Sequence, residues 1–324
     1  MDRRTLLTTL AATAAASAAP WARAQGFPEQ LIKWVVPYPA GGGTDVIART
    51  LAEAMRQPLG QQIIIDNRPG ASTNIGAELV AKAKPDGYTI LSADNAVLAF
   101  NEHLFSKLPF NPEKDFTYIG AIGKFPLALV VHPDFPAQDF KAFLAYVKAN
   151  PGKVNYASPG NGSPHHLAME MFKNRTGTFI THIPYRGAAP AMADVMGGQV
   201  PCMFLDLASG LSIIQGKKVR VLAIGTGARS KLLPDVPTLA EVGVPNSEVF
   251  AFQGILGPAG MPPAVVTRLN SELNRSFSTP AVMKRFSDFG MEAMPGTPQQ
   301  FAALSRAESK RWGPIIKAAG IKLD

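Results

Sequence analysis

The chain has 324 residues, of which 46% are hydrophobic and 17% are charged, and its formal net charge is +8. This length and apolar content are enough for the buried core of two lobes, and they exclude a disordered chain. The basic residues are scattered and form no nucleic-acid-binding motif. We therefore expect no nucleic acid partner, and we interpret the positive charge as a long-range attraction for small anions.

The first 24 residues have the three parts of an export signal. Arg3 and Arg4 form the positive end, an apolar run follows from Thr5 to Pro20, and Ala22-Arg23-Ala24 supplies small residues for cleavage before Gln25. The arginine pair is compatible with the twin-arginine route, and the general secretory route stays open. No later stretch of the sequence has the roughly 18 apolar residues of a membrane span. We therefore expect a periplasmic protein.

Short apolar runs then alternate with helical patterns, which is typical of α/β layering around largely parallel sheets. The predicted strands are residues 32–36, 62–66, 88–92, 117–122, 127–131, 154–157, 179–183, 201–205, 219–224 and 249–256. The predicted helices are residues 45–57, 73–83, 140–149, 165–174, 190–196, 211–215, 265–277, 281–289 and 298–318.

Two strand-rich units followed by terminal helices indicate a protein with two lobes. We predict that residues 25–125 form most of lobe 1, that residues 126–248 form lobe 2, and that residues 249–324 return to lobe 1. The chain would then cross between the lobes near Phe125 and near Val249. A short connection, Gly123 to Pro126, is expected to separate the two strands at the first crossing.

One local pattern recurs at the ends of predicted strands: a Gly/Pro-rich loop and then the start of a helix. It occurs at residues 37–45, 67–74, 157–165 and 184–190. The start of a helix offers N–H groups without intrahelical acceptors and the positive end of the helix dipole, which favour an anion. Because ligands of open α/β sheets bind at the carboxyl ends of strands, these loops predict a ligand site.

Individual residues in these loops have more specific roles. Asp45 would repel a bound carboxylate, so we interpret it as a cap of the first helical turn that can pair with Arg49. Ser163 has the chemistry of an N-cap, Pro164 suits a first helical position, and Pro190 is expected to open its helix.

No motif for catalysis, a metal or a cofactor stands out. There is no Gly-x-Ser-x-Gly elbow and no Walker loop, and Gly225-Thr226-Gly227 lacks the third glycine of a dinucleotide fingerprint. The adjacent His165 and His166 diverge on a helix, which disfavours a metal pair. Cys202 stands in an apolar strand and is interpreted as a buried hydrophobic residue. We expect no enzyme, although a periplasmic hydrolase or isomerase stays an alternative.

Several segments closely resemble the extracytoplasmic receptors of tripartite tricarboxylate transporters, also called the Bug family, over essentially the whole mature chain. The segments that carry the resemblance are VPYPAGGGTDVIAR (36–49), DNRPGASTNIGAELVAKAKPDGYT (66–89), SPGNGSPHHLAMEMF (158–172), IPYRGAAPAMADVMGGQV (183–200) and LPDVPTLAEVG (233–243). Ser72 and Thr73 replace glycines that are common in this family, so we expect a stiffer loop there.

The resemblance implies a type II periplasmic binding protein fold, with two lobes, a hinge and an interlobe ligand cleft. It also implies a monomer that captures a small carboxylate (a dicarboxylate, tricarboxylate, aromatic acid or amino acid) for the membrane subunits of a transporter. A sensor that serves a signalling partner stays an alternative. By the same resemblance, backbone amides and bridging waters would hold the carboxylate. The ligand-binding residues that it implies are Tyr38, Ala40, Gly41, Gly42, Gly43 and Thr44 in lobe 1, Ser163 and His165 opposite them, and Asn95 and Asp206 as further lining residues.

Overall fold

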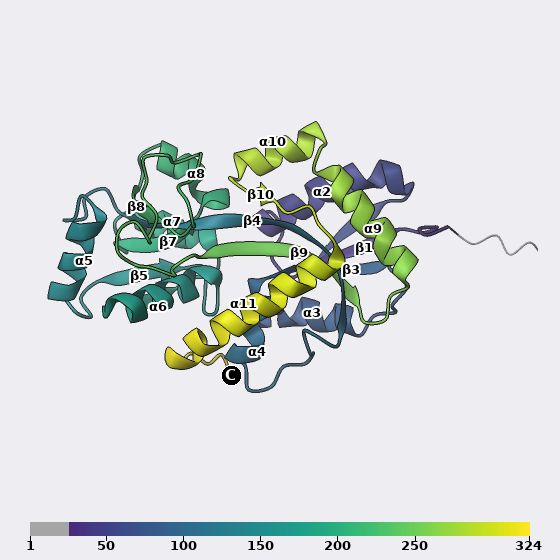
Figure 1. Cartoon of the computed structure of the whole chain (residues 1–324), viewed down its shortest axis with the longest axis horizontal. Helices are drawn as coiled ribbons and strands as arrows, with labels where there is room; N and C mark the ends of the chain where they lie inside the picture. Colours follow the sequence, from purple (N-terminus) through teal and green to yellow (C-terminus); the bar gives the residue numbers. More distant parts are fainter. Residues whose placement is uncertain (1–25) are drawn as a thin grey trace, which may run out of the picture.

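A computed structural model describes residues 26–324 (Figure 1). The predicted export signal and its cleavage site before Gln25 lie outside the described residues. Within the described part of the chain, no helix has both the length and the apolar character needed to cross a membrane.

Lobe 1 is built on a mixed sheet with the strand order β2-β1-β3-β9-β4, and β10 pairs with the outer edge of β4. Strands β1, β2 and β3 are parallel, whereas β9 is antiparallel to both of its neighbours. The strands are β1 (Ile32–Val36), β2 (Ile63–Asn67), β3 (Thr89–Asp94), β4 (Phe116–Val131), β9 (Phe250–Pro258) and β10 (Glu292–Ala293). The helical segments are α2 (Gly43–Leu59), η1 (Ala71–Thr73), α3 (Asn74–Ala81), η2 (Ala96–Phe100), α4 (Asn101–Leu104), α9 (Pro263–Ser276), α10 (Pro280–Asp288) and α11 (Pro298–Ala318).

Lobe 2 repeats this arrangement with the order β6-β5-β7-β4-β8. Its strands are β5 (Asn155–Ser158), β6 (Thr181–Pro184), β7 (Cys202–Asp206) and β8 (Arg220–Ile224), together with the second half of β4. Its helices are α5 (Phe140–Ala149), α6 (Pro164–Thr176), α7 (Ala188–Met196) and α8 (Leu207–Gln215). In lobe 1, β9 arrives from lobe 2 and pairs antiparallel to β3. In lobe 2, β4 arrives from lobe 1 and pairs antiparallel to β7. The predicted two-lobed α/β fold is therefore confirmed.

Two local predictions are wrong, and two helical segments were not predicted. Residues 123–126 are not a connection but the middle of β4, because cross-strand pairing with β9 from Gly123 to Pro126 keeps the backbone extended despite the glycine and the proline. Helix α7 begins at Ala188, two residues before Pro190. The helical segments η2 and α4 were not predicted, because η2 is buried throughout and so lacks the alternation of polar and apolar residues that marks a surface helix.

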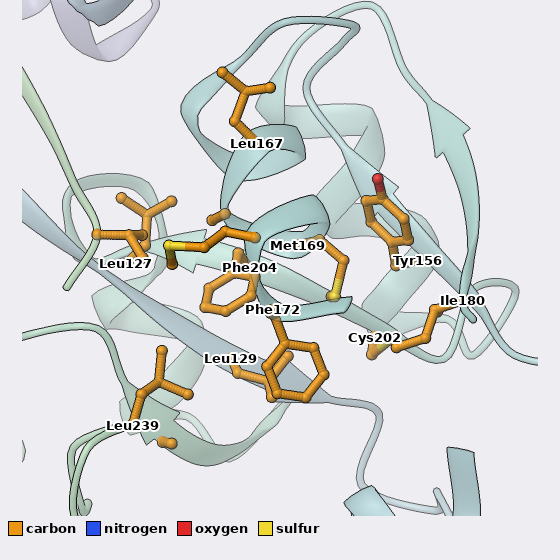
Figure 2. Close-up of a cluster of buried hydrophobic side chains, with 14 of the residues drawn as sticks. Leu127, Leu129, Tyr156, Leu167, Met169, Phe172, Ile180, Cys202, Phe204 and Leu239 are labelled. Atoms are coloured by element: carbon orange, nitrogen blue, oxygen red, sulfur yellow. The ribbon is translucent and has the colours of Figure 1, made fainter. Parts of the chain in front are cut away.

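Buried side chains form clusters on both faces of each sheet. In lobe 2, Phe172 of α6 and Phe204 of β7 pack within the cluster shown in Figure 2. Trp312 and Ile316, from the second half of α11, belong to the same cluster. Because α11 begins against the sheet of lobe 1 and runs diagonally to lobe 2 (Figure 1), it ties the two lobes together. The boundaries proposed for the lobes stay a prediction.

Candidate ligand-binding site

The loop after β1 brings a helix N-terminus to the carboxyl edge of the lobe 1 sheet. Gly42 is the N-cap of α2 in an extended conformation, and because glycine has no side-chain acceptor, no side chain caps the helix. Residues 40–43 are exposed, and a Cβ built on Gly41 or Gly43 would meet no heavy atom within 4 Å. The first N–H groups of α2 have no acceptor within the helix, so this open end of the helix can bind an anion.

A hydrogen-bond network around the buried Asp45 fixes this loop. The Asp45 carboxylate accepts hydrogen bonds from the Gly41 N–H at 2.8 Å, Arg49 Nε at 2.9 Å and Asn67 Nδ2 at 2.9 Å. Asn67 Nδ2 also donates to the Tyr38 carbonyl at 3.0 Å. Burial opposes ionisation of Asp45, but the hydrogen bonds outweigh it and hold its pKa below the ordinary value. The predicted pairing of Asp45 with Arg49 is confirmed, and Asp45 positions the loop.

Tyr38 and Asn95 connect the same edge to neighbouring strands. The Tyr38 hydroxyl donates to Asp94 Oδ2 at the end of β3, and burial together with this carboxylate raises the pKa of Tyr38 well above its ordinary value. The fully buried Asn95 accepts from the Phe252 N–H at 2.7 Å and donates to the Phe250 carbonyl at 3.3 Å. Both amide atoms of Asn95 are thus engaged with the crossing strand β9.

In lobe 2, the nominated residues meet at the starts of α6 and α8. Ser163 accepts from the His166 N–H at 3.3 Å, and Pro164 is the first helical residue, so both predicted roles are confirmed. His165 Nε2 lies 2.9 Å from Asp206 Oδ2, and the carboxylate of Asp206 also caps α8 by accepting from the Ser209 N–H at 2.7 Å. Burial raises the pKa of Asp206, but its bonds to His165 and Ser209 lower it below the ordinary value.

A stack of aromatic rings, which sequence reasoning missed, supports the lobe 2 loop. The rings of His166 and His182 lie 4.0 Å apart and nearly parallel, with Tyr156 next to His182 at 4.7 Å. His166 Nδ1 accepts from the Gly162 N–H at 3.0 Å, and Ser158 Oγ lies 2.6 Å from His182 Nε2. Burial lowers the pKa of His166 to about 4 and that of His182 to about 3.

The contact between Ser158 and His182 is relevant to the hydrolase alternative, because a serine next to a histidine is the core of a nucleophilic site. Ser158 is fully buried, however, and its hydroxyl is also bonded to the backbone of Gly160. A substrate therefore has no access to this serine in the structure. The described residues also contain no group of three or more His, Cys, Asp or Glu side chains placed to hold a metal ion.

The loop that follows β2 has an unusual backbone. Ala71, Ser72 and Thr73 all have positive φ angles, of 46°, 50° and 78°. Left-handed conformations are costly for non-glycine residues and most costly for β-branched ones such as Thr73. The buried Asn101 donates to the Ser72 carbonyl at 2.7 Å and holds the loop in place.

The nominated residues therefore form two groups. Tyr38 and Ala40 to Thr44 lie together at one edge of lobe 1, with Asn95 at the end of the neighbouring strand β3, and Ser163, His165 and Asp206 lie together in lobe 2. Among residues 26–324 no hydrogen bond joins the two groups. The contacts that hold these residues join different elements, such as Tyr38 with Asp94 and His165 with Asp206, and sequence spacing alone does not reveal them.

Two lobes joined by crossing strands, with helix N-termini and Gly-rich loops at the carboxyl ends of strands, define a two-lobed solute-binding protein of the type II fold. Residues 47–321 match the family described as "Tripartite tricarboxylate transporter family receptor". The chain belongs to this family, which confirms the resemblance found in the sequence.

Relatives and solved structures agree with this assignment. Protein BugT of Bordetella pertussis is 36% identical over 301 residues, which cover 93% of this chain and 92% of BugT. The structure of R. palustris Rpa4515 with adipate is similar with a TM-score of 0.85 and 33% identity, and covers 92% of this chain and 99% of its own. The structure of MatC from Rhodopseudomonas palustris with bound malate has a TM-score of 0.82 and 31% identity. The match covers 90% of this chain and 100% of the MatC chain.

Proposed function

We propose that this protein is a periplasmic receptor that captures a small carboxylate between its lobes and delivers it to the membrane subunits of a transporter, without chemical turnover. The observation that carries the proposal is the open N-terminus of α2, with its glycine loop held by the buried Asp45. Adipate and malate, named with two solved relatives, are both dicarboxylates, which supports a ligand of this class.

The mechanism follows from the donors that are available. Arg49, a cation four residues after Asp45 on α2, is bonded to Asp45 and Asn67, so we expect backbone N–H groups and the helix dipole to stabilise the ligand carboxylate. Ser163, His165 and Asp206 would complete the site from lobe 2 when the lobes close. A closed receptor that differs in shape from the open one is a signal that a membrane partner can recognise.

The Gly43→Pro variant tests this mechanism with little disturbance of the fold. Gly43 is the first residue of α2, where the proline ring fits the helix and no intrahelical hydrogen bond is lost. The preceding Gly42 has ψ of 166°, which a following proline tolerates. Proline removes one N–H donor, whereas the matched control Gly43→Ala keeps the donor and adds a methyl group in open space.

Isothermal titration with adipate and malate, and with their diamides as neutral controls, measures the effect. We expect a dicarboxylate to bind the wild type and Gly43→Ala, and to bind Gly43→Pro about 10- to 100-fold more weakly, because a hydrogen bond to a charged group contributes about 1.5–3 kcal/mol. Equal affinity in both variants would contradict the assignment of this helix end. Conversion of the ligand during incubation would contradict the receptor assignment.

A further inference from the structure

A cavity of about 630 Å³ opens between the lobes, and none of the nominated ligand residues lines it. One wall is the loop 225–232 that follows β8 in lobe 2, and the other is the segment 286–292 that leads from α10 to β10 in lobe 1. Lys124 and Pro126 of β4 and Phe250 of β9 form the floor. The cavity therefore lies directly against the strands that cross between the lobes.

The order of the strands separates this cavity from the nominated carboxylate site. In lobe 1, β1 and β3 lie on one side of β4 and β10 lies on the other. In lobe 2, β5 and β7 lie on one side of β4 and β8 lies on the other. The nominated loops follow β1, β3, β5 and β7, whereas the cavity is lined by the ends of β8 and β10. The cavity is therefore a second space between the lobes, and the crossing strands separate it from the nominated carboxylate site.

The polar groups that line the cavity include two opposite charges without partners. Among residues 26–324, neither the Lys231 ammonium nor the Glu248 carboxylate takes part in an ion pair. The other charges are paired. Lys124 Nζ lies 3.3 Å from Glu292 Oε2, and Arg229 Nε lies 3.0 Å from Glu241 Oε2.

The remaining lining adds an unsatisfied hydroxyl and apolar surface. Thr226 Oγ1 is buried without a hydrogen-bond partner, and a buried hydroxyl in this state is unfavourable. Phe250, Phe286, Leu232 and Met291 supply apolar surface. The cavity thus combines a free cation, a free carboxylate and an apolar wall.

We propose that this cavity is an accessory binding site for a zwitterion with an apolar side chain, such as a free apolar amino acid. Lys231 binds its carboxylate, Glu248 binds its ammonium group, and the apolar wall receives its side chain. Because the two walls belong to different lobes, an occupant stabilises this arrangement of the lobes and so changes the affinity of the carboxylate site. The accessory site does not depend on the function proposed above.

Methyl NMR of protein labelled at the methionine methyl groups tests this proposal at one residue. Met291 lines the cavity, and Met291→Leu assigns its signal. The probes are L-leucine, leucinamide, which lacks the carboxylate, and 4-methylpentanoate, which lacks the ammonium group. The variants are Lys231→Gln and Glu248→Gln, with Lys141→Gln on the exposed face of α5 as the matched loss of a charge.

We expect L-leucine to shift the Met291 signal in the wild type, in Lys141→Gln and in Gly43→Pro. Binding should be about tenfold weaker in Lys231→Gln and Glu248→Gln, and about tenfold weaker for either singly charged probe. No shift of Met291, or equal shifts with all three probes, would overturn the proposal. It would also be overturned by a shift that Gly43→Pro abolishes and Lys231→Gln leaves intact, because leucine would then occupy the carboxylate site.

Discussion

The stacked histidines behind the lobe 2 loop predict how the stability of the protein depends on pH. Burial lowers the pKa of His166 to about 4 and that of His182 to about 3, from the ordinary value of 6.5. Between pH 6.5 and pH 4 the unfolded chain binds two protons that the folded protein excludes, so the free energy of unfolding decreases as the pH falls. Each proton contributes about 1.4 kcal/mol per pH unit, so the pair removes roughly 2.5 kcal/mol between pH 6 and pH 5.

Urea unfolding followed by tryptophan fluorescence at pH 6 and pH 5 measures this loss. In His182→Gln one of the two groups is absent, and the amide can still bond Ser158, so we expect about half of the wild-type loss. Above about pH 8 both histidines are neutral in the folded and in the unfolded state, which provides the internal control. The same loss in the variant as in the wild type, or greater stability at pH 5 than at pH 6, would refute the reasoning.

Three further experiments have definite expected outcomes. Thr73→Gly should raise the free energy of unfolding by about 1 kcal/mol, because glycine adopts a φ of 78° without strain. If the variant unfolds at a lower urea concentration than the wild type, the backbone of Thr73 is not strained. Cys202 should stay unreactive toward a thiol reagent until the protein unfolds, because burial raises the pKa of its thiol; labelling of the native protein would show that it is accessible. Asp45→Ala should weaken carboxylate binding about tenfold in titration calorimetry, although it removes a negative charge, because the Gly41 loop loses its anchor; tighter binding would show that repulsion dominates.

Long, periodic or capped elements could be predicted from the sequence. The helix expected at residues 298–318 has those bounds in α11, where Thr297 forms a capping box with Gln300. The interpretation of Cys202 as a buried residue is also confirmed. In these places the local signals and the tertiary structure favour the same conformation, so short-range reasoning is sufficient.

The contacts of the candidate site could not be predicted in this way. Tyr38 and Asp94 are 56 residues apart, and His165 and Asp206 are 41 residues apart. Only the order of the strands brings each pair together, and that order has no local signature. The continuous strand β4 has the same explanation, because its pairing with β9 overrides the turn preference of a glycine and a proline.

The loop after β1 shows why a carboxylate next to the proposed anion site is no contradiction. Asp45 is only 2% exposed, and its oxygens accept bonds from Gly41, Arg49 and Asn67. Its charge is compensated on the inner side of the loop, while the first N–H groups of α2 stay free on the outer side. Removing Asp45 would therefore release the backbone that presents those donors. A cation added near the loop would not restore the position of that backbone. The affinity of such a site depends on how rigidly the loop is held, because backbone donors stabilise an anion only when they converge on one point.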